Sequence, residues 1–384
     1  MSAVQDQNTP TRFRLHLTEE PLTLAVLIAL AVALFLGVSG LSRLFEAQRE
    51  SLASRWFARG AADLGAQRFE QAVVEFRSAL LYARDDYTYQ LNLAEALIGL
   101  KRTEEANSYL MNLREREPDD GVVNLELARI AAQKGETDQA LRYYHNALYA
   151  TWPSDEEGRR RDVRVELIDF LLRNHLRAQA ESELIALEAN ASDQPVEQER
   201  IGDLFVRTMD FERAFVAYRT ALKSDRHNPA LEAKAGLAAF ELARYTLAHR
   251  YLQAAVEGDA SDAESADRLK TTELVLQMDP FQRQISSAQR AKMVVKAFSI
   301  AGDRLKACNP QATPVTQTLQ QSLQQNWTKM RPHVNELELR RDPDMAETTM
   351  ELVFNIERQT STTCGAPQGE DLALLLIAGL HEGS

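Results

Sequence analysis

Six alanines recur at a near-constant interval along the chain. The successive spacings are 34, 34, 40, 34 and 34 residues. A period of 34 residues accommodates two antiparallel helices joined by a turn, a unit that cannot bury its apolar face alone. The period therefore predicts an all-α solenoid of stacked helical hairpins. The alanines are Ala72, Ala106, Ala140, Ala180, Ala214 and Ala248.

Other small and large residues recur in phase with these alanines. The first unit shows the pattern Trp56, Gly60, Phe69, Ala72, Phe76 and Ala79. We expect small residues where the two helices of one hairpin approach closely, and large residues one turn later to fill the gap to the next hairpin. Five of the six units keep this phase. Six extra residues and a run of three arginines precede the fourth unit, so the register of its first helix stays open.

The pattern resembles the tetratricopeptide repeat family over roughly residues 53–260. The resemblance is strongest at Ala72, Phe76 and Ala79, and at Ala214, Tyr218 and Ala221. It implies a right-handed α-solenoid of about six hairpins, whose first helices line a concave groove for a peptide or a partner's helix. The alternative, a non-repetitive helical bundle, does not account for five units in phase.

An uncharged apolar stretch, Leu22 to Leu41, precedes the repeats. Twenty helical residues span about 30 Å, the thickness of the hydrocarbon core of a bilayer. A cleaved signal peptide has a shorter apolar core and a cleavage site, so we favour a retained anchor. We expect an N-terminal tail at 1–20 and a transmembrane helix at 21–43. A second span is not expected, because the apolar stretch at 372–380 is too short.

Small side chains recur every four residues within the expected anchor. A face of this kind lets a second helix approach closely, which would allow a homo-oligomer to form through the anchor. Alanine is also common in transmembrane helices, and composition is the preferred explanation of the pattern. The residues are Ala25, Ala29, Ala33 and Gly37.

Two features bear on the orientation of the anchor, and they disagree. Arg12 and Arg14 precede the span whereas four arginines follow it, so a count of positive charges would keep the large domain in the cytoplasm. An N-terminal anchor with a short tail commonly exports the chain that follows. The only two cysteines, Cys308 and Cys364, are what a disulfide pair in an exported domain would require. We expect a periplasmic domain, with the cytoplasmic orientation and two unrelated buried thiols as alternatives.

The 34-residue phase is lost beyond residue 260, although helix-compatible apolar spacing continues. A solenoid exposes the apolar face of its last hairpin, which something must cover. We therefore expect residues 261–384 to form a helical C-terminal cap. Its expected helices are 263–276, 286–306, 316–329, 345–358 and 371–380, separated by prolines.

Composition and motifs argue against several functional classes. The formal net charge of −12 disfavours nucleic acid as a partner. The histidines and cysteines lack the spacing of a metal site, and no nucleotide-binding glycine motif or G-x-S-x-G sequence is present. We expect no enzymatic activity, no metal and no cofactor. An enzyme hidden in residues 261–384 remains the third alternative.

The repeat frame assigns the residues that face the expected groove. They are mostly apolar in the first three units and of mixed charge in the last two. Some members of the family hold a C-terminal carboxylate in a basic clamp, which needs Lys, Arg or Asn at four positions. Here these positions hold Phe57, Ala61, Leu91 and Glu95. An adaptor that binds the C-terminal tail of a chaperone is therefore not expected. The predicted groove residues are Phe57, Ala61, Leu64, Leu91, Glu95, Ile98, Val122, Leu125, Arg129, Glu199, Asp203, Arg207, Ala233, Leu237 and Phe240.

The resemblance and the anchor together predict a membrane-anchored scaffold that binds protein partners through its groove. Its resemblance to anchor-plus-repeat envelope proteins suggests the inner membrane of a bacterium and a role in envelope assembly. A holdase-like chaperone is the main alternative, because the first half of the expected groove is apolar.

Overall fold

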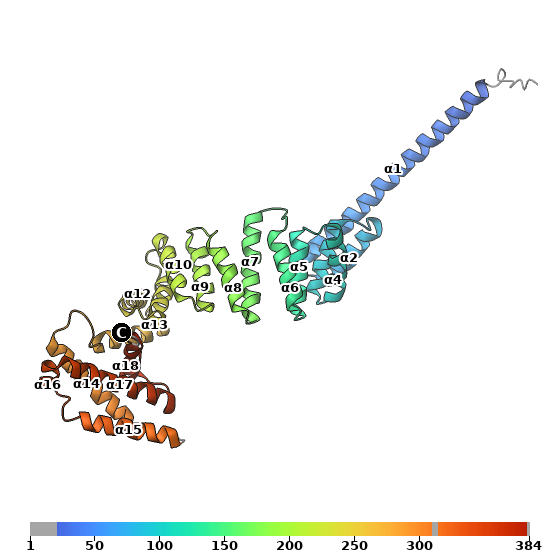
Figure 1. Cartoon of the computed structure of the whole chain (residues 1–384). Coiled ribbons are helices and arrows are strands. Elements are labelled where there is room, and N and C mark those ends of the chain that lie inside the picture. The colour runs from blue at the N-terminus through green and yellow to red at the C-terminus, as the bar shows by residue number, and fades with distance from the viewer. Residues whose placement is uncertain (1–20, 309–313, 382–384) are drawn as a thin grey trace, which may run out of the picture. The chain divides into compact units, whose positions relative to one another are not determined.

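The computed structural model describes residues 21–308 and 314–381, and all regular elements in these ranges are helices (Figure 1). The chain forms two compact units, residues 1–163 and 164–384. The boundary between the two units falls within α7 (Glu156–Arg173). The predicted division into a solenoid at 53–260 and a cap at 261–384 stays a prediction. The tail expected at 1–20, with Arg12 and Arg14, lies outside the described residues.

Unit 1 contains three helical hairpins. Each pairs a first helix with the second helix that follows it along the chain. The first helix of the first hairpin is the C-terminal part of α1 (Pro21–Gly65). The remaining helices are α2 (Phe69–Tyr82), α3 (Tyr87–Gly99), α4 (Thr103–Arg116), α5 (Gly121–Gln133) and α6 (Thr137–Tyr149).

Unit 2 continues the hairpin pattern and then departs from it. Its repeat helices are α8 (Arg177–Glu188), α9 (Pro195–Arg207), α10 (Phe211–Ser224), α11 (Pro229–Glu241) and α12 (Tyr245–Gly258). The helices that follow are α13 (Ala263–Met278), α14 (Ser287–Ala307), α15 (Pro314–Met330), α16 (Glu336–Arg341), α17 (Pro343–Thr363) and α18 (Gly369–Leu380). The short helix α16 was not expected from the sequence. Pro314 and Pro343 begin helices, because proline is well tolerated in a first turn.

The six periodic alanines are fully buried, as the repeat requires. In three of the hairpins a glycine on the first helix allows close approach of the second: a Cβ atom on Gly60 would lie 2.7 Å from the ring of Phe76. Gly202 lies in the same way beneath Tyr218, and Gly236 beneath Leu252. The large residue therefore packs on the glycine of its own hairpin. Tyr218 also faces the following hairpin, where the Lys234 ammonium of α11 lies 6.0 Å from the centre of its ring.

The turn inside each hairpin also repeats with the 34-residue period. Each turn holds one residue with positive φ, five residues before the periodic alanine. The residue that follows donates its backbone N–H to a carbonyl five positions earlier, as in Arg102 to Leu97 at 2.9 Å. This is the Schellman arrangement that ends many helices. The positive-φ residues are Gln67, Lys101, Gly135, His175, Met209 and Ala243.

The six extra residues before the fourth repeat pack back onto unit 1. Trp152 is buried, and its indole N–H donates to the carbonyl of Ala147 at 3.1 Å. Its ring covers Gly121, where no Cβ could fit. The backbone of Thr151 also pairs with that of Asp119 and Gly121. The insertion is therefore part of the core of unit 1 rather than a flexible connection.

Helix α18 packs onto the helix that follows the last repeat of unit 2. Helix α18 packs against α13, and α14 and α17 also contact it. Leu374 and Ile377 of α18 are fully buried. Helix α13 therefore packs against a helix about 100 residues later in the chain, with α14–α17 between them in sequence, and His381 at the end of α18 lies 3.4 Å from Asp279 at the end of α13.

Helix α1 has 45 residues and joins the apolar N-terminal segment to the first hairpin without a break (Figure 1). Its apolar part has a mean hydropathy of 2.7 and is not buried. By length and composition it can cross a membrane, and among the described residues it is the one helix that meets this description. The expected anchor at 21–43 and the first repeat helix from residue 53 are thus one continuous helix.

Candidate partner-binding surfaces

The first helices of unit 1 present a partly exposed, mainly apolar surface, here called the unit 1 surface. It comprises the nine predicted groove residues of α1, α3 and α5, and each of them is half-buried. The members are Phe57, Ala61, Leu64, Leu91, Glu95, Ile98, Val122, Leu125 and Arg129. At one end of this set the ring of Phe57 stacks on Tyr89, with centroids 4.6 Å apart.

One carboxylate on this surface has no partner. Glu126 pairs with Arg129 at 2.6 Å, whereas the described residues offer Glu95 neither a hydrogen bond nor an ion pair. Burial raises the pKa of Glu95, and the neighbouring charge of Glu126 raises it further. Glu95 is therefore a half-buried carboxyl group without a partner among the described side chains, placed to accept an N–H or a cation from a bound segment.

The first helices of unit 2 present charges that are already paired with one another. This unit 2 surface comprises Glu199, Asp203 and Arg207 of α9 with Lys234 and Leu237 of α11. The Lys234 ammonium contacts Glu199 and Asp203, each at 2.7 Å. Arg207 pairs with Asp169 of α7.

Lys234 was not among the predicted groove residues, although it holds this network together. Burial alone would lower its pKa, but the bonds to Asp203 and Glu199 outweigh that effect and raise the pKa. Asp203 also accepts a 2.8 Å hydrogen bond from the Tyr218 hydroxyl, which, with burial, raises the pKa of that tyrosine. The sequence signal that could have found Lys234 was its position directly after Ala233, which is a predicted groove residue.

Two predicted groove residues of α11 are nearly inaccessible. Phe240 is 6% exposed and Ala233 is 8% exposed. The ring of Phe240 packs edge-on against Tyr245, and the Arg268 guanidinium of α13 covers it at 4.9 Å. The helix that follows the last repeat therefore removes Phe240 from any partner-binding surface.

The two cysteines, Cys308 and Cys364, are joined as a disulfide between the ends of α14 and α17, with their Cα atoms 5.6 Å apart. One turn earlier, Arg304 donates to the Thr360 hydroxyl at 2.8 Å and to the Gly365 carbonyl at 2.9 Å. The covalent bond and these hydrogen bonds lie side by side. Together they fix α17 to α14.

Arg304 also lies beside a buried carboxyl group. The Glu357 side chain is fully buried, and Arg304 lies 3.3 Å from it and 3.5 Å from Asp371 of α18. Burial is the main cause that raises the pKa of Glu357 to about 8, and the charge of Asp371 raises it further. The charge of Arg304 lowers this pKa, but by less. Burial likewise raises the pKa of Asp371. One arginine thus faces two carboxyl groups that do not both ionise readily.

Unit 2 also contains a cavity of about 520 Å³ with polar walls. Phe281 and Phe354 form its apolar part, and the ring of His381 lies tilted against that of Phe281, with ring centroids 4.5 Å apart. Among the residues that line it there is no serine, cysteine or lysine that would serve as a nucleophile. The remaining lining residues are Glu347, Glu351, Asn355 and Arg358.

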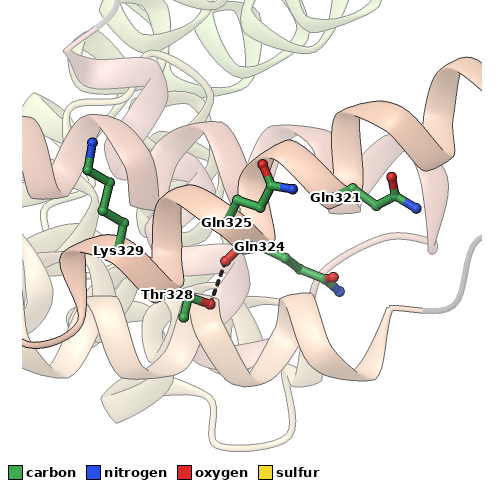
Figure 2. A pocket seen from close by; sticks show the side chains of 5 residues that line it. All are labelled: Gln321, Gln324, Gln325, Thr328 and Lys329. Carbon is green, nitrogen blue, oxygen red and sulfur yellow. Dashed lines mark hydrogen bonds between the residues drawn. The ribbon is translucent and has the colours of Figure 1, made fainter.

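A second cavity, of about 460 Å³, lies along α15 and opens to solvent. Figure 2 shows its lining, which is three glutamines with Thr328 and Lys329. Thr328 donates its hydroxyl proton to the backbone carbonyl of Gln324 at 2.7 Å. These are exposed side chains of one helix face and do not converge on a point. Groups of His, Cys, Asp or Glu able to hold a metal are absent from the described ranges.

Comparison with known proteins agrees with the repeat assignment. The tetratricopeptide repeat family profile matches residues 63–130. The hairpins on either side of this match repeat the same buried alanines and turns. A comparison with curated protein sequences finds no significant match.

Several solved structures are similar to parts of the chain. YrrB, a tetratricopeptide repeat protein with an unusual peptide-binding site, is 14% identical, with a TM-score of 0.39, over 50% of this chain and 95% of its own. PilW, a type IV pilus biogenesis factor, is 15% identical with a TM-score of 0.40, over 58% and 98%. A repeat protein from Parabacteroides merdae is 12% identical with a TM-score of 0.40, over 65% and 93%. Similarity at this level concerns the repeated hairpin and does not extend to function.

The predicted anchor face lies on the unpacked part of α1. Ala25, Ala29, Ala33 and Gly37 are all exposed, and a Cβ on Gly37 would meet no atom within 4 Å. Self-association through these four residues therefore stays a prediction.

Proposed function

We propose that the protein is a membrane-anchored scaffold that binds an apolar segment of a partner protein on the unit 1 surface. The observation that carries the proposal is the contrast between the two surfaces. Charges on the unit 2 surface are paired internally, whereas the unit 1 surface leaves apolar side chains and the Glu95 carboxylate available. Binding there buries apolar area without first breaking an ion-pair network.

The test uses the full chain in its membrane, with variants on both surfaces. Leu91→Asp combined with Leu125→Glu places two charges in the proposed contact and should lower recovery of the partner at least tenfold. Val196→Asp is the matched control, because Val196 is a 79% exposed apolar residue on a first helix of unit 2. Equal recovery with all three proteins would contradict the assignment of the binding surface.

A holdase-like chaperone is the second candidate, and the same exposed apolar side chains favour it. A chaperone would suppress the aggregation of unrelated unfolded clients in proportion to its own amount, and Leu91→Asp would reduce that effect. A scaffold would instead enrich one defined partner. Quantitative mass spectrometry of the captured proteins, alongside a light-scattering assay with two unrelated clients, separates the two functions.

We further propose that α1 anchors the protein in a bacterial inner membrane, with the repeats in the periplasm and a role in envelope assembly. Support comes from the length and hydropathy of α1, and from the Cys308–Cys364 disulfide, because such bonds persist in oxidising compartments. Alkylation of intact cells tests the compartment. Labelling of the two cysteines only after reduction is the expected result, and free thiols that react only after lysis would place the domain in the cytoplasm.

A further inference from the structure

Helix α1 carries a leucine repeat that the expected small-residue face does not include. Its members are separated alternately by three and four residues, and the series continues through Gly37 to Gln48. Spacing of this kind places side chains on one narrow stripe of a helix, as in a coiled coil. The stripe is Leu27, Leu30, Leu34, Gly37, Leu41, Leu44 and Gln48, and its leucines are 56–71% exposed.

The stripe extends beyond the part of the helix where lipid alone would explain it. Charged residues begin at Arg43, which marks the end of the uncharged segment. From there to residue 52 the large apolar side chains are restricted to one side, at Leu44, Phe45 and Leu52, around the uncharged Gln48. Every face of a helix in hydrocarbon is apolar, so restriction to one side after Arg43 indicates a protein neighbour on that side.

The first hairpin does not cover this stripe. Ala53 and Gly60 are the positions at which α1 is buried in the first hairpin. At about 100° per residue, Leu41, Leu44 and Gln48 point on average about 140° away from that side. All three of these side chains are exposed. The next positions of the same frame, at 51 and 55, hold serine and arginine, so the stripe ends at Gln48, before the hairpin is reached.

We propose that the stripe binds the same stripe of a second copy, giving a parallel pair of α1 helices that runs through the membrane and on to Gln48. This inference rests on the membrane anchoring proposed above. Two copies inserted in one membrane with one orientation run parallel and at equal depth, so their stripes meet in register. Gly37 permits close approach within the bilayer.

Charge also favours a second copy as the occupant. The charges that follow the anchor, Arg43, Glu46, Arg49 and Glu50, all lie off the stripe and its flanks. Two identical helices can therefore meet along this face without placing like charges opposite each other. The flanking positions, which carry no charge, are Gly40, Phe45, Ala47 and Leu52.

The one polar member of the stripe fits a pair of identical helices in register. In such a pair, the Gln48 side chains of the two copies face each other. An amide both donates and accepts hydrogen bonds, so two glutamines can satisfy one another across the pair. A single polar residue at a seam position is also a known means of fixing register and the number of chains.

Cysteine cross-linking of the full chain in membrane vesicles tests the pair. Gln48→Cys and Ser51→Cys lie in the frame of the stripe, whereas Glu46→Cys and Glu50→Cys lie at the same depth on the other side. Mild oxidation should give a reducible dimer band at least five times stronger for the first two variants. The protein without added cysteines should give none, because its own cysteines are bonded to each other.

Further changes and a membrane control make the outcome decisive. Leu41→Ala with Leu44→Ala should reduce the Ser51→Cys cross-link at least fivefold while the repeats stay folded, and Gln48→Glu should reduce it by opposing two like charges. Equal cross-linking from both sides, or none from either, would overturn the pair and leave lipid as the covering of the stripe. Protein released from the membrane by carbonate would contradict the anchoring, whereas retained protein without cross-links would contradict the pair alone.

Discussion

The first helices of unit 1 and unit 2 expose surfaces of different chemistry, although the same 34-residue repeat builds both. In unit 1 the predicted groove positions hold Leu91, Ile98 and Leu125, and Glu95 has no partner among the described residues. In unit 2 the equivalent positions hold Glu199 and Asp203, and Lys234 bonds to both. The repeat specifies how hairpins stack, because its buried alanines and glycines are shared. What the surface can bind depends on the positions that the repeat leaves free.

The largest difference expected between the units is in their response to reduction. The disulfide of unit 2 joins cysteines 56 residues apart, and a loop of that size stabilises a fold by about 4 kcal/mol on the chain-entropy model. Cys308→Ser with Cys364→Ser should therefore lower amide hydrogen-exchange protection in α14 and α17. Protection in α3–α6 should not change. Equal loss of protection in both units would contradict the view that each unit is stabilised by its own core.

The stability of unit 2 should also depend on pH through Glu357. Its pKa is raised from 4.5 to about 8, so the folded state keeps a proton that the unfolded chain releases. The contribution of Glu357 to the stability of the folded state is therefore greatest below pH 4.5, and it falls as pH rises to about 8. The slope is at most about 1.4 kcal/mol per pH unit.

Denaturant unfolding at several pH values measures this slope. Glu357→Gln should flatten it, and Glu351→Gln, an exposed position on the same helix, should leave it unchanged. A wild-type profile already flat between pH 5 and 8 would show that Glu357 ionises normally.

Removal of one lysine from each unit compares the stability lost when an ion-pair network is broken with that lost when a single ion pair is broken. Lys234→Met leaves Glu199 and Asp203 facing each other and should destabilise the protein by about 1 kcal/mol. Lys134→Met breaks one 2.9 Å pair with the 80% exposed Glu104 and should cost less than about 0.5 kcal/mol. Denaturant titration of both variants checks the order. The reverse order would mean that the unit 2 charges are not held together by Lys234.

The last prediction concerns the turn that both units share. Lys101 and Met209 have φ values of 60° and 61° at equivalent turns, in a conformation that glycine adopts without strain. Lys101→Gly and Met209→Gly should each stabilise the protein by about 0.5 kcal/mol, whereas Gly135→Ala should destabilise it by about 1 kcal/mol. Thermal unfolding of the three variants measures these differences. A gain in one unit and a loss in the other would show that the turns are not equivalent.

The sequence was sufficient to predict the repeated hairpins, because a fixed period of buried small residues leaves few other ways to pack. All six periodic alanines are fully buried. The positive-φ turns were missed because five of their six residues are not glycine, and only Gly135 carries the usual signal. The pairing of α18 with α13 was missed in detail because it joins segments about 100 residues apart, and local periodicity contains no information about such contacts.

The candidate surface was predicted less well than the fold. The frame placed the nine unit 1 residues on a partly exposed face, but it also assigned Phe240 to the groove, where Arg268 covers it. It passed over Lys234, because the partners of a charged side chain depend on the neighbouring helix. A mixture of charges in sequence does not show whether those charges are free or paired with one another.

The most direct test of the account is site-specific photo-crosslinking in cells, with a benzophenone amino acid placed at Leu91 or Leu125 of unit 1, or at Val196 or Leu237 of unit 2. The unit 1 positions should cross-link to one partner protein, and the unit 2 positions should not. Cross-links to that partner from Val196 and Leu237, with none from Leu91 and Leu125, would contradict it.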